Sequence, residues 1–122
     1  MPSRRQDPTI PYYDVVFTRC ETTMHYLILL HEAENGSTRR PGARPAHLAR
    51  LDELRQQGRL VLAGPLPKID ADDPGAAGYS GSAIVAQFDD LDTARIWAEA
   101  DPYRAAGVTE RVTVFPFKQV MP

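Results

Sequence analysis

The sequence predicts an α+β domain whose elements follow the order βαββαβ. Four apolar runs have the length and composition of strands, and two longer segments carry apolar residues at helical spacing. Clusters of Gly, Pro, Asp and Asn separate these segments, as expected of turns. The chain of 122 residues is long enough for one domain with its own core. This order is the pattern of the ferredoxin-like fold, in which an antiparallel four-stranded sheet carries two helices on one face.

The first strand and the first helix are predicted within residues 24–57. Residues 24–32 are apolar on both faces, which indicates a central strand, and Glu-Asn-Gly-Ser at 34–37 ends it. Residues 45–57 predict a helix, with Gly58 in the position of a C-cap. Its predicted inner face carries Leu48, Leu51 and Leu54, and its predicted outer face carries Arg50, Glu53, Gln56 and Gln57.

The middle of the chain predicts two further strands. Residues 60–63 form an apolar run that leads into Gly64-Pro65-Leu66-Pro67. Two prolines so close together place this strand at an edge of the sheet or at a bend. Residues 70–81 are a loop by composition, with Asp-Asp-Pro-Gly as a turn signal. A third strand follows at about 82–88.

A second helix and a fourth strand complete the pattern. Asp89 or Asp90 is expected to cap this helix at its amino end. Asp101-Pro102 ends it, because a proline disfavours helical geometry in the residue before it. The last strand is predicted at about 108–118. The apolar residues that support these two elements are Leu91, Ala94 and Trp97 in the helix, and Val112 and Val114 in the strand.

Composition excludes several classes of protein. The chain has 14 Lys and Arg against 16 Asp and Glu, and no stacking aromatics stand between its short arginine pairs, so nucleic acid is not an expected partner. The longest apolar run, residues 26–30, is too short to span a bilayer. Cys20 is the only cysteine, which excludes an intrachain disulfide and a thiolate zinc cluster. We therefore expect a cytoplasmic protein with no membrane partner.

Residues 1–23 are predicted to be an N-terminal extension outside the domain of residues 24–122. They are rich in Pro, Arg, Asp and Thr, show no sustained period, and lack the apolar core of a signal peptide. Met24 opens the first convincing strand, so it is also a candidate for the true translation start. Mass spectrometry of the native protein would test this, since peptides from upstream of Met24 would exclude it.

The strongest chemical lead is the sequence Arg44-Pro45-Ala46-His47-Leu48. Proline is tolerated in the first turn of a helix and disfavours helical geometry in the preceding residue, so Arg44 is expected just before the helix and His47 in its first turn. Residues three apart are neighbours on a helix, so these two could face one pocket as an anion clamp beside a proton-exchanging group. The alternative is a solvated arginine and a structural histidine.

Other groups of polar residues do not predict a metal or a phosphate site. His25 and His31 lie six residues apart on one strand, about 20 Å, which is too far for both to bind one ion. The acidic residues of the 70–81 loop are not followed by the final glutamate of a calcium loop. Its glycines do not open a helix, as a phosphate-binding loop requires. No metal and no cofactor are therefore expected.

Several short motifs of the chain follow one another in a recognisable order. They are Arg44-Pro45-Ala46-His47-Leu48-Ala49-Arg50-Leu51, Gly58-Arg59-Leu60, Ala63-Gly64-Pro65, Asp73-Pro74-Gly75-Ala76-Ala77-Gly78, Gly81-Ser82, Trp97-Ala98, Ala100-Asp101-Pro102-Tyr103, Ala106-Gly107-Val108 and Pro116-Phe117-Lys118. Together they resemble the YciI-like (YCII-related) family over about residues 24–120. The N-terminal extension and the segment 35–42 lie outside this resemblance.

The resemblance implies a ferredoxin-like fold that assembles as a dimeric α+β barrel. It also implies an active site centred on a histidine and an aspartate, which correspond to His47 and Asp101 here. Most members of the family have no established substrate. Some relatives suggest cofactor-independent elimination or isomerisation of small oxygenated rings.

A dyad of His47 and Asp101 also agrees with general chemistry. In this topology the two helices lie antiparallel, so we expect the end of the second, at Asp101, near the start of the first, at His47. A carboxylate bonded to one imidazole nitrogen fixes the tautomer and strengthens the other nitrogen as a base. The alternative is that Asp101-Pro102-Tyr103 is only a helix stop, whose carboxylate binds local amides.

Five residues are candidates for substrate binding: Arg44, Gly64, Pro65, Ser82 and Tyr103. Arg44 could hold a carboxylate or a phenolate as a planar bidentate donor. Gly64, Pro65 and Ser82 could line the pocket, or they could simply mark the ends of strands. The tyrosine could cover a ring of the substrate or pack beneath the turn.

Two hypotheses from different classes follow, and both include a homodimer and a small-molecule ligand. The first is a cofactor-independent lyase or isomerase that acts by general acid–base catalysis on a small oxygenated metabolite, such as an aromatic ring or a lactone. The second is a non-catalytic dimeric module that binds a ligand in the same pocket. Helices on one side of the sheet leave its other face to be buried, most simply against a second copy.

Overall fold

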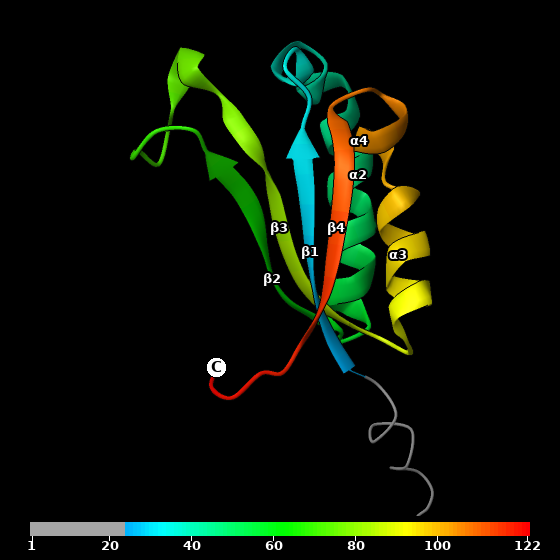
Figure 1. The fold of residues 1–122 in the computed structure, drawn as a ribbon. Coiled ribbons are helices and arrows are strands. Elements are labelled where there is room, and N and C mark those ends of the chain that lie inside the picture. Colours follow the sequence, from blue (N-terminus) through cyan, green and yellow to red (C-terminus); the bar gives the residue numbers. More distant parts are fainter. Residues whose placement is uncertain (1–23) are drawn as a thin grey trace, which may run out of the picture.

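A single antiparallel sheet forms one layer of the protein in the computed structural model (Figure 1). The structure describes residues 24–122, so the predicted extension 1–23 and Cys20 lie outside the described residues. The strands stand in the order β2-β3-β1-β4. Their bounds are β1 Met24–Glu32, β2 Leu60–Pro67, β3 Tyr79–Phe88 and β4 Thr109–Phe117.

The helices form a second layer on one face of this sheet (Figure 1). Their bounds are α2 Arg40–Gln56, α3 Leu91–Glu99 and α4 Pro102–Ala105, and two 3₁₀ turns are η1 Gly36–Thr38 and η2 Gly75–Ala77. The ferredoxin-like α+β fold predicted from the sequence is confirmed, with α4 as a short helix that the sequence pattern did not predict. Among residues 24–122, no helix has the length and apolar character needed to cross a bilayer.

β1 lies at the centre of the sheet, as predicted, between β3 and β4. Its residues Tyr26, Ile28 and Leu30 are buried in the core beneath the helices. The core continues through Leu51 and Leu54 of α2. β2 pairs only with β3 and is an edge strand, which explains how it accommodates two prolines that cannot donate to a ladder.

Helix α2 begins at Arg40, five residues earlier than predicted, and contains Pro45 in its interior. Arg44 is therefore a helical residue, and His47 lies about two turns inside the helix, so the predicted placement of both was wrong. Pro45 removes one helical hydrogen bond. The added turn is tied to the sheet instead, because Arg40 donates hydrogen bonds to Glu32 and Ser82.

The carboxyl end of α2 confirms the role predicted for Gly58. Its φ of 71° lies in the left-handed region that glycine adopts at little cost. The N–H of Gly58 donates to the carbonyl of Arg55 at 3.0 Å, and the N–H of Arg59 donates to the carbonyl of Leu54 at 2.9 Å. This pair of bonds is a Schellman motif, which satisfies the last carbonyls of the helix and turns the chain into β2.

Of the two aspartates expected to cap α3, Asp90 is the cap. The N–H of Thr93 donates to Oδ1 of Asp90 at 2.7 Å, and this hydrogen bond lowers the pKa of the carboxyl. At the other end, α3 stops at Glu99, and Asp101 is the N-cap of α4. Pro102 therefore opens a new short helix as well as ending the previous one.

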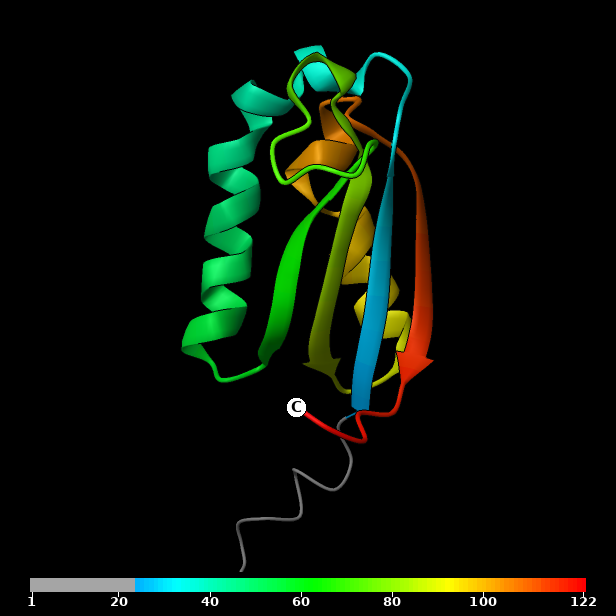
Figure 2. The same ribbon diagram turned by 90° about the vertical axis from the view of Figure 1, so that its left-hand side faces the viewer.

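The opposite face of the sheet carries no helix of the described chain (Figure 2). Strand register places Leu27 of β1 opposite Val85 of β3 and Phe115 of β4, and Leu62 of β2 also opposite Val85. We call this surface the open face; its apolar residues are Leu27, Leu29, Leu62, Leu66, Val85, Phe115 and Phe117. Leu62 and Phe115 are 54% and 47% exposed, so the open face presents apolar side chains to solvent.

Candidate active site

A cavity of about 290 Å³ opens between α2 and the edge of the sheet that β2 and β3 form. This volume is near the lower end of the range of small-molecule sites, about 300–1,000 Å³. Leu48 lines it and is 41% exposed, so the prediction that this leucine belongs to the core was wrong. The lining also includes His47 and all five residues predicted to bind a substrate, namely Arg44, Gly64, Pro65, Ser82 and Tyr103.

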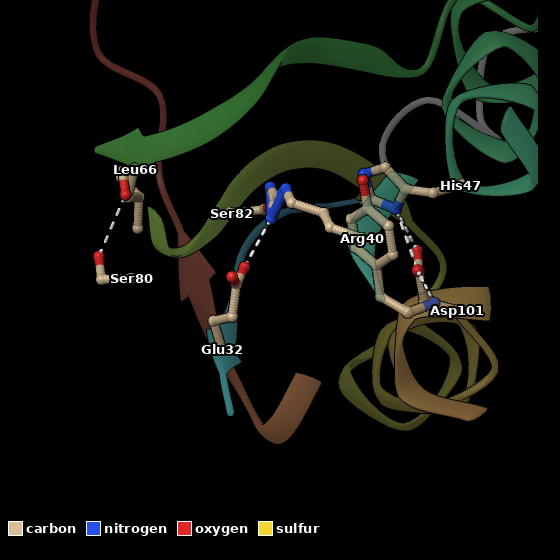
Figure 3. Close-up of polar contacts among 8 residues, drawn as sticks. Glu32, Arg40, His47, Leu66, Ser80, Ser82 and Asp101 are labelled. Atoms are coloured by element: carbon tan, nitrogen blue, oxygen red, sulfur yellow. Dashed lines mark hydrogen bonds and ion pairs between the residues drawn. The ribbon is translucent and has the colours of Figure 1, made fainter. Parts of the chain in front are cut away.

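His47 and Asp101 are in direct contact beside this cavity (Figure 3). Nδ1 of His47 lies 2.9 Å and 3.0 Å from the two carboxylate oxygens, and the residues are 5% and 1% exposed. A carboxylate accepts, so this contact places a hydrogen on Nδ1, and in the neutral form of the ring the lone pair is then on Nε2. The contact fixes the orientation of the imidazole at the wall of a small cavity.

The backbone around Asp101 explains how its carboxylate is held. Asp101 has extended geometry as the N-cap of α4, and Oδ1 accepts the N–H of Tyr103 at 2.9 Å. Both sequence interpretations of this residue therefore apply, since the carboxylate binds a local amide and also His47. The position of this contact on α2 differs from the prediction, because Asp101 contacts the interior of the helix rather than its start.

Tyr103 packs against the dyad. Its ring stacks on the imidazole of His47 with centroids 4.1 Å apart and planes inclined by 14°, and the residue is 1% exposed. Burial raises the pKa of Tyr103, against the lowering effect of Arg40 and Arg44. The phenol therefore keeps its proton near neutral pH, and the ring that Tyr103 covers is the imidazole.

Arg40 is a residue of this site that the sequence interpretation missed. It donates to Oε1 of Glu32 at 2.6 Å and to Oγ of Ser82 at 3.0 Å, as Figure 3 shows for Glu32. Its guanidinium carbon lies 4.8 Å and 4.9 Å from the ring centroids of Tyr79 and Tyr103. Burial raises the pKa of Glu32, although Arg40 acts in the opposite direction. Arg40 is thus held in place as part of the wall.

Arg44 lies on the same face of α2, one turn from Arg40 and one turn from His47. It is exposed and lines the cavity. Within residues 24–122, Arg44 takes part in none of the ion pairs or side-chain hydrogen bonds. Its guanidinium is therefore available to an anionic group of a ligand, whereas that of Arg40 is occupied.

The cavity thus combines three chemical functions. His47 brings an imidazole that can exchange a proton, Arg44 a cation, and Leu48, Leu51 and Ile84 an apolar surface. In the described part of the chain, no three His, Cys, Asp or Glu side chains come together as a group that could hold a metal ion. The arrangement fits acid–base chemistry on a small anionic molecule.

The sequence matches bacterial proteins over 97 residues. It is 52% identical over 97 residues to Protein YciI of Escherichia coli O6:H1, and the match covers 80% of this chain and 99% of that protein. An uncharacterized protein of Haemophilus influenzae is 45% identical over the same length and coverage.

A solved structure shares the fold at lower identity. The 5-chloro-2-hydroxyhydroquinone dehydrochlorinase TftG of Burkholderia phenoliruptrix, in complex with 2,5-dihydroxybenzoquinone, superposes with a TM-score of 0.68 and 23% identity, over 78% of this chain and 94% of that chain. The profile of the YCII-related domain matches residues 24–118, which include the whole sheet, the cavity and the His47–Asp101 pair. Because of this match and the 52% and 45% identity to the two relatives, the chain belongs to the YCII-related family.

Proposed function

We propose that this protein is a cofactor-independent lyase or isomerase that acts by general acid–base catalysis on a small, oxygenated, anionic metabolite. His47 is the base, and it later returns the proton as an acid. Asp101 orients the imidazole, and Arg44 holds an anionic oxygen of the substrate. The observation that carries the proposal is the buried His47–Asp101 hydrogen bond at the wall of a cavity that a small molecule fits.

The strength of such a base limits the substrate class. Positioned general-base catalysis contributes about 10²–10⁴-fold, which suffices for protons that are already acidic. Phenols, enols and carbons next to a carbonyl group qualify. A flat ring with such a group also suits a cavity whose lining includes Leu48, Leu51 and Ile84 together with Gly64 and Pro65. The dehydrochlorinase with the same fold acts on a hydroxylated ring, which guides the choice of test compounds.

The proposal includes assembly as a homodimer through the open face. This face carries leucine and phenylalanine side chains of β1, β2 and β4, with the buried Val85 of β3 between them and His25, Gln87 and Arg111 around them. An apolar centre with a polar rim is the usual anatomy of a protein interface. Monomeric proteins seldom expose large apolar patches, and a stable dimer buries about 800 Å² per partner.

The ligand class is tested by thermal shift of the purified protein with a set of small phenols, enols, lactones and carboxylates. We expect the stabilising compounds to be anionic at neutral pH. Arg44→Met should weaken their binding about 10- to 100-fold, because a charge-assisted hydrogen bond contributes about 1.5–3 kcal/mol. Arg55→Met, which changes an exposed arginine paired with Asp52 on the same helix, is the control and should bind normally. Stabilisation by neutral compounds alone, unaffected by Arg44→Met, would contradict the proposed class.

A further inference from the structure

Asp101 lies near a permanently charged side chain that is not part of the dyad. Nη1 of Arg50 lies 3.8 Å from Oδ2 of Asp101, the oxygen that is 2.9 Å from Nδ1 of His47. Arg50 stands three residues after His47, on the same face of α2. The prediction that Arg50 points outward was wrong, because its guanidinium turns toward Asp101 and Trp97.

The guanidinium of Arg50 packs against an aromatic ring, and one of its nitrogens is buried without a hydrogen bond in the described structure. Its guanidinium carbon lies 4.3 Å from the ring centroid of Trp97 in α3, so the aromatic ring supports the charge. Nη1 is buried and has no hydrogen-bond partner in the described structure, at a distance from Asp101 longer than a hydrogen bond. Burial lowers the pKa of Arg50, while Asp101 and Glu53 oppose this. The ordinary pKa of a guanidinium is so high that, even when lowered, it leaves the group charged near neutral pH.

The arrangement of charge decides which protonation state of the imidazole is favoured. A buried carboxylate next to a histidine alone favours the imidazolium, because the ion pair removes an isolated buried charge. An imidazolium cannot accept a proton. With a permanent cation already beside the carboxylate, the neutral imidazole leaves the three groups balanced, and protonation would add an excess positive charge.

The other charged groups around His47 act in the same direction or are neutralised. Arg44 lies on the same helix, and it adds positive potential at the cavity. The charge of Arg40 is matched by Glu32 of β1. Tyr103 of α4 is a neutral phenol near neutral pH, because burial raises its pKa. Among the residues described around the dyad, Arg50 is therefore the cation that faces Asp101 directly.

We propose that Arg50 is a positioning residue of the dyad: its guanidinium compensates the charge of Asp101 and thereby keeps His47 a neutral proton acceptor near neutral pH. Trp97 fixes the guanidinium from the side of α3. The inference deepens the function proposed above and rests on His47 as the base. Arg50 acts through Asp101, and it does not line the cavity.

The test is an NMR titration of the ¹⁵N-labelled imidazoles, with the His47 signals assigned from a His47→Gln sample. We expect Arg50→Met, which keeps an apolar side chain against Trp97, to raise the titration midpoint of His47 by about one pH unit, a tenfold change in proton affinity. Arg50→Gln, a second neutral variant, should give the same direction if the methionine variant does not fold. Arg50→Lys retains a cation and should restore most of the wild-type midpoint.

Arg55→Met serves as the matched control, since it removes an exposed arginine from the same helix, and it should leave the midpoint unchanged. The inference is overturned if a folded neutral variant titrates His47 within about 0.2 of the wild-type midpoint, against the one-unit effect expected of a nearby charge. It is also overturned if Arg50→Lys shifts the midpoint as far as Arg50→Met. Because no substrate is needed, failure here is distinct from failure of the proposed reaction, which is read from turnover.

Discussion

His47→Gln is expected to lower turnover about 10²–10⁴-fold while the affinity for a ligand of the cavity changes little. The glutamine amide can still donate a hydrogen bond to Asp101 and has a volume similar to that of imidazole. It offers no basic lone pair, so the proton transfer loses its acceptor. The measurement is turnover under saturating substrate, together with the dissociation constant of a bound compound.

The same experiment separates the enzyme from a ligand-binding module. His25→Gln, which changes a histidine at the far end of β1, is the control and should retain turnover. If the wild-type protein binds a compound tightly and leaves every candidate substrate unchanged, the non-catalytic hypothesis is favoured. Turnover that survives His47→Gln would show that the imidazole is not the base.

The wild-type protein is expected to be a dimer at micromolar concentration, and Leu27→Asp is expected to make it monomeric. Leu27 lies at the centre of the open face, opposite Val85 and Phe115. An unpaired carboxylate buried there costs about 3–5 kcal/mol, which weakens dimerisation at least about 100-fold. Size-exclusion chromatography with light scattering distinguishes 13.6 kDa from twice that mass.

Ile96→Asp provides the matched control for this experiment. Ile96 is an apolar residue of α3 that is 71% exposed and lies away from the open face, so its replacement should leave the dimer intact. A wild-type protein of monomer mass would reject the proposed assembly. A dimer that persists in Leu27→Asp would place the interface on another surface, such as the free edge of β4.

The sheet could be predicted because its signals are local. Each strand is a short apolar run bounded by turn residues, and the prolines of 64–67 marked an edge. The start of α2 could not be predicted in this way. Pro45 indicates a helix start when only neighbouring residues are considered, whereas the helix is extended by contacts of Arg40 with β1 and β3.

The candidate site, too, was predicted only where local sequence signals or the family resemblance pointed to its residues. The spacing of Arg44 and His47 identified two residues that line one cavity, and the family resemblance supplied Asp101. Arg40 and Arg50 were missed, since the segment of Arg40 had no matching motif and helical periodicity placed Arg50 outside. The spacing of Arg40, Arg44 and His47 on one helical face is the signal that could have found Arg40.

The most direct test of the dyad is the tautomer of the His47 ring, measured by ¹⁵N chemical shifts at neutral pH without substrate. If Asp101 orients the ring, Nδ1 carries the hydrogen and Nε2 is unprotonated, and Asp101→Asn weakens this preference. The proposed mechanism predicts this result. A ring with its hydrogen on Nε2, or one fully protonated at neutral pH, would contradict the role of His47 as the base.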